Sequence, residues 1–166
     1  QARKLPNPFH SKNGREFKFQ WIDLCDSSMT LKIRNSKNVV QMSYGNKEVS
    51  NEDHAFFINN YIELPRIDLI IIDKLTNTYV GSVNINLTNY GLEIGKYIGD
   101  KRFLGLGIAS NSMISFLDFL KAYLAGARIV AKTMKSNLVN IHINKKIGFV
   151  DIEDLNDIYI LMSRRL

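Results

Sequence analysis

Apolar and polar residues alternate along several short stretches of the chain, which is the pattern of half-buried β-strands. In residues 16–24 the aromatic side chains of Phe17, Phe19 and Trp21 alternate with polar ones, which predicts a first strand. Six further strands are predicted at residues 67–73, 79–87, 92–98, 128–134, 150–155 and 158–166. Short polar turns join the three within residues 67–98, so we expect them to form an antiparallel meander.

Apolar residues three and four positions apart replace this alternation in residues 110–127. That spacing predicts a long helix with a wide buried face. Three shorter helices are predicted at residues 26–36, 48–64 and 136–149, with Ser50 as the N-cap of the second. About seven strands and about four helices in this order predict one mixed α/β domain around a twisted, mostly antiparallel sheet.

The first fifteen residues follow neither pattern. They are polar, contain two prolines and have no hydrophobic period, so we expect residues 1–15 to be a tail or linker. The single domain is then expected to span residues 16–166. A chain of 166 residues is long enough to bury a core of its own.

Composition and charge narrow the classes of partner. No apolar run reaches the ~18 residues of a membrane span and no secretory signal is visible, so we expect a cytoplasmic protein with no membrane partner. One cysteine, Cys25, excludes an internal disulfide. Residues 101–166 hold 10 basic and 5 acidic side chains, within a net charge of +6 for the whole chain. Such a surface attracts phosphates, but nucleic acid and metal are not expected because no helix-turn-helix, aromatic–basic interleaving or zinc spacing is present.

The stretch KRFLGLGIAS, residues 101–110, is the candidate for phosphate binding. Gly105 and Gly107 stand where a predicted strand gives way to the long helix, and Arg102 precedes them. Glycines at this place let an anion approach the unpaired N–H groups of a helix N-terminus. The spacing lacks the Gly-Lys step of a P-loop and the third glycine of a dinucleotide fingerprint. An ordinary glycine turn therefore stays open as an alternative.

The pattern R-x-x-G-x-G after a strand, opening a buried helix, resembles the acyl-coenzyme A signature of the GNAT superfamily of N-acetyltransferases. The segment NLVNIHINKKIGF resembles that superfamily's N-x-x-[AS]-x-x-x-Y-x-K-x-G-F pattern, and the matching positions are Asn137, Lys146, Gly148 and Phe149. The resemblance covers about residues 17–165. It implies the GNAT fold, splayed at the acyl-CoA site, and an enzyme that moves an acetyl group from acetyl-CoA to a primary amine.

Residues 32–60 are similar to the opening of the nucleotide-linked amino-sugar acetyltransferases of nonulosonic acid synthesis, such as the pseudaminic acid pathway. This similarity implies a sugar nucleotide as the small-molecule amine substrate. Acetyltransferases of ribosomal-protein and other peptide N-termini and of polyamines share much of the pattern, so those acceptors stay open. A catalytically inactive acyl-CoA-binding relative and a homodimer also stay open.

The GNAT resemblance implies cofactor-binding positions around the glycine stretch. Backbone amides of residues 104–110 are expected to hold the pyrophosphate, and the strand end at Tyr97 and Ile98 to pair with the pantetheine arm and supply an oxyanion donor. The positions implied are Tyr97, Ile98, Arg102, Leu104, Gly105, Leu106, Gly107, Ile108, Ala109, Ser110, Asn137 and Lys145. Lys101, Lys132, Lys135 and Lys145 are candidates for the 3′-phosphate, with a solvated face as the alternative.

The catalytic candidates are Glu93, Asn144 and His142. Glu93 is on the strand before the cofactor loop, where many family members keep a carboxylate base; the alternative is a surface glutamate that faces solvent or pairs with Lys96. The family's frequent tyrosine, an acid for the leaving thiolate, falls at Asn144, and asparagine has no acidic proton. His142 is two residues away and should point elsewhere. Another residue serves as the acid, or the thiolate leaves unaided, or the protein is inactive.

The acceptor is expected across the sheet from the cofactor, against the first two helices. The candidates there are Arg34, Asn35, Met42, Tyr44, Glu48 and His54, with Phe57 beside them. Arg34 could hold a nucleotide phosphate, and His54 could stack or form a hydrogen bond. The alternatives are an exposed His54 and a Phe57 that belongs to the core.

Overall fold

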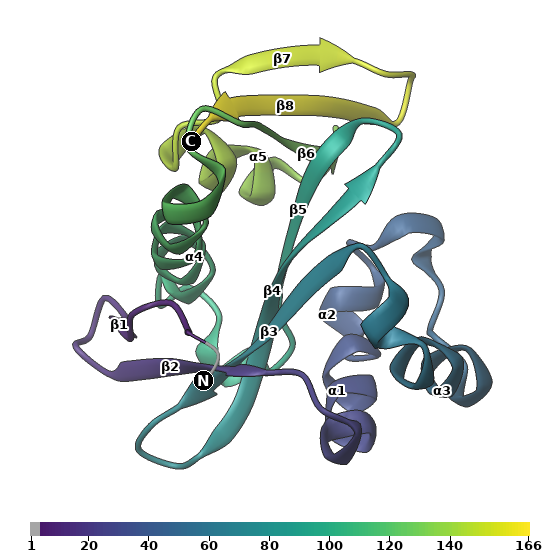
Figure 1. The fold of residues 1–166 in the computed structure, drawn as a ribbon, viewed down its shortest axis with the longest axis vertical. Helices are drawn as coiled ribbons and strands as arrows, with labels where there is room; N and C mark the ends of the chain where they lie inside the picture. Colours follow the sequence, from purple (N-terminus) through teal and green to yellow (C-terminus); the bar gives the residue numbers. More distant parts are fainter. Residues whose placement is uncertain (1–3) are drawn as a thin grey trace.

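The computed structural model describes residues 4–166, except for the side chains of Leu24 and Tyr44. Within this range eight strands form one sheet, in the order β1-β2-β3-β4-β5-β6-β8-β7 (Figure 1). They are β1 (Phe9–His10), β2 (Glu16–Trp21), β3 (Arg66–Asp73), β4 (Thr78–Thr88), β5 (Gly91–Ile98), β6 (Arg128–Met134), β7 (Asp151–Asp154) and β8 (Tyr159–Arg165). Neighbouring strands are antiparallel except β5 and β6, which run parallel.

Five α-helices of the described residues cover the two faces of this sheet (Figure 1). One face carries α1 (Ser27–Arg34), α2 (Lys37–Val40) and α3 (Asn51–Asn59), and the other carries α4 (Ile108–Leu124) and α5 (Leu138–Lys146). None of the helices in residues 4–166 combines the length and the apolarity that crossing a bilayer requires. The mixed α/β architecture predicted from the sequence is confirmed.

The predicted elements are all present, and the counts differ by one strand and one helix. The meander predicted within residues 67–98 is confirmed as β3, β4 and β5. Ser50 is the N-cap of α3, and its hydroxyl accepts the N–H of Asp53 at 3.0 Å. The unpredicted elements, β1 and α2, have two and four residues, and such lengths are too short to show a period.

The N-terminal segment is part of the fold from Phe9 onward, so the expectation of a tail over residues 1–15 is wrong there. Phe9 is 7% exposed and stacks on Phe17 with 5.5 Å between ring centroids. Phe9 also pairs with Phe17 in the antiparallel β1–β2 ladder. The contact between Phe9 and Phe17 anchors this segment, and a single apolar residue leaves no periodicity in the sequence. Residues 1–3 lie outside the described range.

The core lies mainly between the sheet and α4. Met113, Phe116 and Leu120 on α4 are 0–2% exposed, and they belong to one apolar cluster with Val83 and Ile94 of the sheet. Burial of such side chains contributes about 1.5–3 kcal/mol each. This packing fixes the start of α4 relative to the end of β5.

The sheet opens between β5 and β6. Among the described residues, their parallel pairing is limited to Leu92 with Ile129 and Glu93 with Val130. Both strands continue beyond these pairs, to Ile98 and Met134. Main-chain groups along the diverging edges are therefore not paired across the opening, and they can bind an extended ligand.

Candidate active site

The turn between β5 and α4 contains two glycines in the left-handed backbone region. Gly105 and Gly107 both have φ of +77°, which a residue with a Cβ adopts only at a cost. A Cβ on Gly105 would meet no atom within 4 Å. The backbone conformation, rather than a lack of space, therefore requires glycine at position 105.

The N-terminus of α4 faces this turn. The N–H of Asn111 donates to the carbonyl oxygen of Gly107, the N-cap residue, at 3.0 Å. The N–H groups of residues 108–110 come before it and have no acceptor within the helix. These donors and the dipole of a 17-residue helix create a site suited to a phosphate.

Lys12 places a cation beside the turn, and sequence reasoning missed it. Its N–H donates to the carbonyl oxygen of Leu106 at 2.9 Å. Its Cγ and Cε lie 3.1 and 3.3 Å from where a Cβ on Gly107 would be, and the ammonium is one bond beyond Cε. Lys12 belongs to the segment interpreted as a tail, so no pattern in the sequence could mark it.

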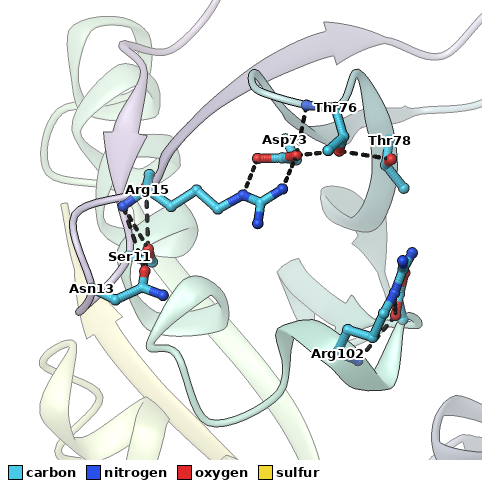
Figure 2. Close-up of polar contacts among 8 residues, drawn as sticks. Ser11, Asn13, Arg15, Asp73, Thr76, Thr78 and Arg102 are labelled. Carbon is cyan, nitrogen blue, oxygen red and sulfur yellow. Dashed lines mark hydrogen bonds and ion pairs between the residues drawn. The ribbon is translucent and has the colours of Figure 1, made fainter.

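Arg102, predicted to lie near the pyrophosphate, folds back on Asp100 (Figure 2). Its Nη2 lies 2.5 Å from Oδ2 of Asp100, and the arginine side chain is 76% exposed. The hydrogen bond from Arg102 is the largest cause that lowers the pKa of Asp100. Exposed ion pairs contribute little, so Arg102 can exchange Asp100 for an anionic ligand.

Tyr97 and Ile98 end β5 beyond its last pair with β6. The carbonyl oxygen of Ile98 accepts a hydrogen bond from Nδ2 of Asn38 on α2 at 2.7 Å, so this strand end is held in place. Asn137, predicted to bind the pantetheine arm, is the N-cap of α5, where its Oδ1 accepts the N–H of Asn140 at 3.1 Å.

A polar cluster lies on the α5 side of the opening. Nζ of Lys96 on β5 donates to Oδ1 of Asn140 at 2.8 Å and to Oδ1 of Asn144 at 2.6 Å. Asn144 is fully buried, and burial lowers the pKa of Lys96 to about 7. Sequence reasoning missed Lys96 as a site residue because a lysine on a strand usually indicates a solvent-facing position.

Glu93 lies on the other face of β5. Side chains alternate along a strand, so Glu93 shares the α1–α3 face with Tyr97, whereas Lys96 lies on the α4–α5 face. Glu93 is half-buried, and Asn86 is its cross-strand neighbour on β4. The sheet therefore separates the Glu93 candidate from Asn144. His142 is exposed on α5, as expected for a side chain that points away from Asn144.

A cavity of about 240 Å³ lies on the α1–α3 face, where the acceptor was predicted. Its wall includes Arg34, His54, Phe57, Asp68, Asn84 and Tyr97. The first three of these residues were among the predicted acceptor residues or beside them. Asp68 and Asn84, which lie on strands, could not be recognised as acceptor residues from the sequence, because a single polar residue on a strand has no distinctive pattern.

Positive charge exceeds negative charge in the wall of this cavity. Asp68 is paired with Arg66, with 2.6 Å between Nε and Oδ2. Arg34 donates from Nη1 to Oγ of Ser43 at 2.8 Å, and no carboxylate of the described residues forms an ion pair with it. Burial raises the pKa of Tyr97 to about 12, so its phenol is neutral at ordinary pH.

His54 is buried rather than exposed, so the alternative of a solvent-facing first-turn histidine is wrong. It is 7% exposed, and its Nε2 lies 2.8 Å from the carbonyl oxygen of Ser27 and 3.2 Å from Oγ1 of Thr30. These contacts join α3 to α1. His54 therefore shapes the cavity wall as part of the packing between two helices.

The remaining predicted acceptor residues are not in the cavity wall. The side-chain amide of Asn35 bonds both the N–H and the carbonyl oxygen of Val49, at 2.9 and 2.8 Å, and so holds the loop before α3. Met42 and Glu48 are exposed outside the wall. The side chain of Tyr44 lies outside the described part of the chain.

The lysines predicted for a 3′-phosphate are spread over different elements. Lys132 lies over the ring of Tyr159, with 4.7 Å from Nζ to the centroid, and Lys135 pairs with Asp154 at 3.0 Å. Lys101 and Lys145 are exposed, on the segment before α4 and on α5. The structure does not gather these lysines into one cluster. The residues described also contain no group of three or more His, Cys, Asp or Glu side chains suited to a metal ion.

Comparisons with known proteins agree with this geometry. The sequence profile of the family described as Acetyltransferase (GNAT) domain matches residues 20–150. A search of curated proteins found no match. A domain from Methanocaldococcus jannaschii is similar, with a TM-score of 0.80 and 24% identity over 92% of this chain and 99% of that one.

Two of the similar structures are of named acetyltransferases. Ribosomal-protein-S5-alanine acetyltransferase from Vibrio fischeri has a TM-score of 0.72 and 18% identity over 90% of this chain and 92% of that one. Spermidine N-acetyltransferase from Vibrio cholerae, in complex with CoA and spermine, has a TM-score of 0.75 and 16% identity over 90% of this chain and 95% of that one. At these identities the likeness establishes the fold.

Proposed function

Because the chain belongs to the GNAT family of acetyltransferase domains, we propose that it acetylates the primary amine of a nucleotide-linked amino sugar. Family membership makes it an acetyl-CoA-dependent N-acetyltransferase. The nucleotide-linked acceptor is the proposal, and the observation that carries it is the excess of positive charge in the cavity beside α1 and α3.

The residues at the glycine turn fit acetyl-CoA. When bound, this group supplies a thioester carbonyl that an amine can attack and a sulfur that can leave. The N–H groups of residues 108–110 and the ammonium of Lys12 would bind its pyrophosphate. The diverging edges of β5 and β6 would bind its pantetheine arm as an added strand does.

The acceptor cavity is suited to an anionic group on the substrate. Arg34 would bind a phosphate of the nucleotide through its guanidinium, which forms bidentate bonds with phosphate oxygens. A polyamine would instead need carboxylates, and the carboxylate of Asp68 in this wall is already paired with Arg66. This charge distribution supports a nucleotide-linked acceptor over spermidine.

Glu93 is our candidate for the base that takes a proton from the acceptor amine. It lies on the same face of β5 as Tyr97, which lines the cavity. A carboxylate acts as a base on an amine directly or through one water molecule. The backbone N–H groups near Tyr97 and Ile98 would stabilise negative charge on the carbonyl oxygen.

The test is a panel of acceptors assayed by the release of free thiol. The panel contains a nucleotide-linked amino sugar, the same sugar without its nucleotide, spermidine and a peptide that begins with alanine. We expect kcat/KM to be about 100-fold higher with the nucleotide than without it, because charged hydrogen bonds contribute about 1.5–3 kcal/mol.

Equal kcat/KM for the two sugars would contradict the proposed acceptor, as would faster turnover of spermidine or the peptide. Binding of acetyl-CoA by calorimetry with no turnover of any amine would identify an inactive relative. No heat with acetyl-CoA on folded protein would contradict the donor site itself.

A further inference from the structure

Lys96 is held at one position by two side-chain amides. Its ammonium can donate three hydrogen bonds, and two of them go to the Oδ1 atoms of Asn140 and Asn144 at 2.8 and 2.6 Å. The Nδ2 atoms of these amides donate to Oγ1 of Thr133, at 3.2 and 3.1 Å. Thr133 therefore fixes both amides with their oxygens toward Lys96.

This cluster crosses the opening of the sheet. The last β5–β6 pair joins Glu93 and Val130. Lys96 is three residues beyond this pair on β5, and Thr133 is three residues beyond it on β6. The ammonium of Lys96 thus lies at the diverging edges where the pantetheine arm is expected to bind, and it keeps one N–H donor for a further acceptor.

The surroundings of Lys96 are neutral. Asn140 and Asn144 of α5, Thr133 of β6 and the cross-strand neighbour Val83 of β4 carry no charge. Within the described residues, burial alone lowers the pKa of Lys96, to about 7. This ammonium releases a proton far more easily than an exposed lysine, whose pKa is about 10.4.

We propose that Lys96 is the catalytic residue that gives a proton to the sulfur of the leaving coenzyme A. The proposal rests on the acetyltransferase function proposed above. As the amine nitrogen bonds to the acetyl carbon, the carbon–sulfur bond breaks and its electron pair stays on sulfur. One proton moves from Nζ of Lys96 to that sulfur, which leaves a thiol and a neutral lysine. The amine proton leaves to Glu93 or water, and solvent reprotonates Lys96.

The other side chains near the opening do not fit this role. Asn144 has no acidic proton, but it positions the ammonium of Lys96. Tyr97 points to the acceptor cavity on the opposite face, and its phenol has a pKa of about 12. A thiol has a pKa of about 8.5, so a thiolate takes a proton far more easily from Lys96 than from Tyr97.

The test compares the wild type with Lys96→Met, Lys96→Gln, Tyr97→Phe and Lys121→Met. Lys121 is exposed in the last turn of α4, outside the proposed site, and is the control for loss of a lysine. Calorimetry first measures binding of CoA and of desulfo-CoA, and an ultraviolet titration then follows the thiolate of bound CoA. We expect bound thiolate to form at a pH about one unit lower in wild type than in either Lys96 variant, because a nearby ammonium favours the thiolate.

The two control variants should titrate like the wild type. With an acceptor that the wild type acetylates, Lys96→Met should lose about 100-fold or more in kcat. The proposal is overturned if the Lys96 variants bind CoA normally and show the wild-type thiolate titration. If they do not fold, lysine NMR of the wild type decides, because CoA must raise the pKa of Lys96 above its value with desulfo-CoA. A wild type that binds neither ligand would instead contradict the acetyltransferase function.

Discussion

Arg15 forms a two-point ion pair with the buried carboxylate of Asp73 (Figure 2). Nε of Arg15 lies 2.6 Å from Oδ1 and Nη2 lies 2.5 Å from Oδ2. The Asp73 side chain is fully buried, and the Arg15 side chain is 31% exposed. The Arg15 guanidinium also lies 5.2 Å from the ring centroid of Phe103. This pair therefore ties the N-terminal segment to the end of β3 and to the approach to the glycine turn.

Arg15→Met should destabilise the protein more than the double variant Arg15→Met/Asp73→Asn. The single change leaves a buried carboxylate without its cation, which is the costly half of breaking such a pair. Chemical denaturation of both variants and the wild type measures this order. A double variant that is less stable than the single one would contradict the account.

The contribution of this pair should also depend on pH. The hydrogen bond from Arg15 is the largest cause that holds the pKa of Asp73 well below its usual range. A carboxylate with a lowered pKa stabilises the fold above its unfolded pKa of about 3.9, and this contribution is lost as the pH falls further. The stability difference between wild type and Arg15→Met should thus be constant near pH 7 and shrink below about pH 4.

Gly105→Ala should weaken binding of acetyl-CoA about tenfold and reduce stability by about 1 kcal/mol, because alanine resists a φ of +77°. Gly126→Ala is the matched control. Gly126 has a φ of +80°, and its Cβ would also meet no atom within 4 Å. Calorimetry should show normal binding for Gly126→Ala despite a similar loss of stability. An equal loss of affinity in both variants would mean that the turn at 105 has no special role.

Lys96 should make the free energy of unfolding rise with pH between about 7 and 10.4. Its pKa is lowered to about 7 by burial, so in this window the unfolded chain binds more protons than the folded one. Stability should rise relative to Lys96→Met by up to about 1.4 kcal/mol per pH unit. Denaturation curves at pH 7 and 9.5 measure the difference, and an equal difference in stability at both pH values would refute the lowered pKa of Lys96.

Glu93→Gln should lower kcat about 100-fold and leave the affinity for acetyl-CoA unchanged, since a positioned base contributes about 10²–10⁴ in rate. The rate should then rise with pH as the acceptor amine loses its proton in solution. The double variant Glu93→Gln/Asn86→Asp moves the carboxylate to the cross-strand position on β4, and it tests whether a carboxylate there restores the activity that Glu93→Gln loses. A wild-type kcat for Glu93→Gln would remove this residue from the mechanism.

Arg34→Met should raise KM for the nucleotide-linked acceptor about 10- to 100-fold, with little change for the same sugar without its nucleotide. The reason is that Arg34 is the cavity cation without a carboxylate partner among the described side chains. Lys37→Met, exposed on α2 outside the cavity wall, is the control. An equal change in KM for both acceptors would mean that Arg34 does not bind the nucleotide.

Long periodic segments made most of this fold predictable from sequence. In α4 and in strands β3 to β5, the spacing of apolar residues along the sequence matches the face that is buried. The segment around Phe9 does not, because a two-residue strand is held by contacts with β2 that no local pattern encodes. Lys12 was missed as a consequence.

The site divides in the same way. The glycine turn was predictable because its backbone demands glycine at fixed spacing, and Arg34 and His54 were predictable from the resemblance of residues 32–60. Lys96 was not, since its importance arises only when β5, β6 and α5 come together around it. Asn144 in place of the family's frequent tyrosine left three alternatives in the sequence: another acid, a thiolate that leaves unaided, or an inactive protein. The proposal for Lys96 takes the first of these.

The short seam between β5 and β6 divides the sheet into two leaves, β1 to β5 and β6 with β8 and β7. A donor molecule that pairs with the edges of both β5 and β6 would join the two leaves. The contacts that bind the donor would then also hold the leaves together, so binding would stabilise and rigidify the folded protein. At a high concentration of acetyl donor the two leaves would be held rigidly, and at a low concentration they would move more freely relative to each other.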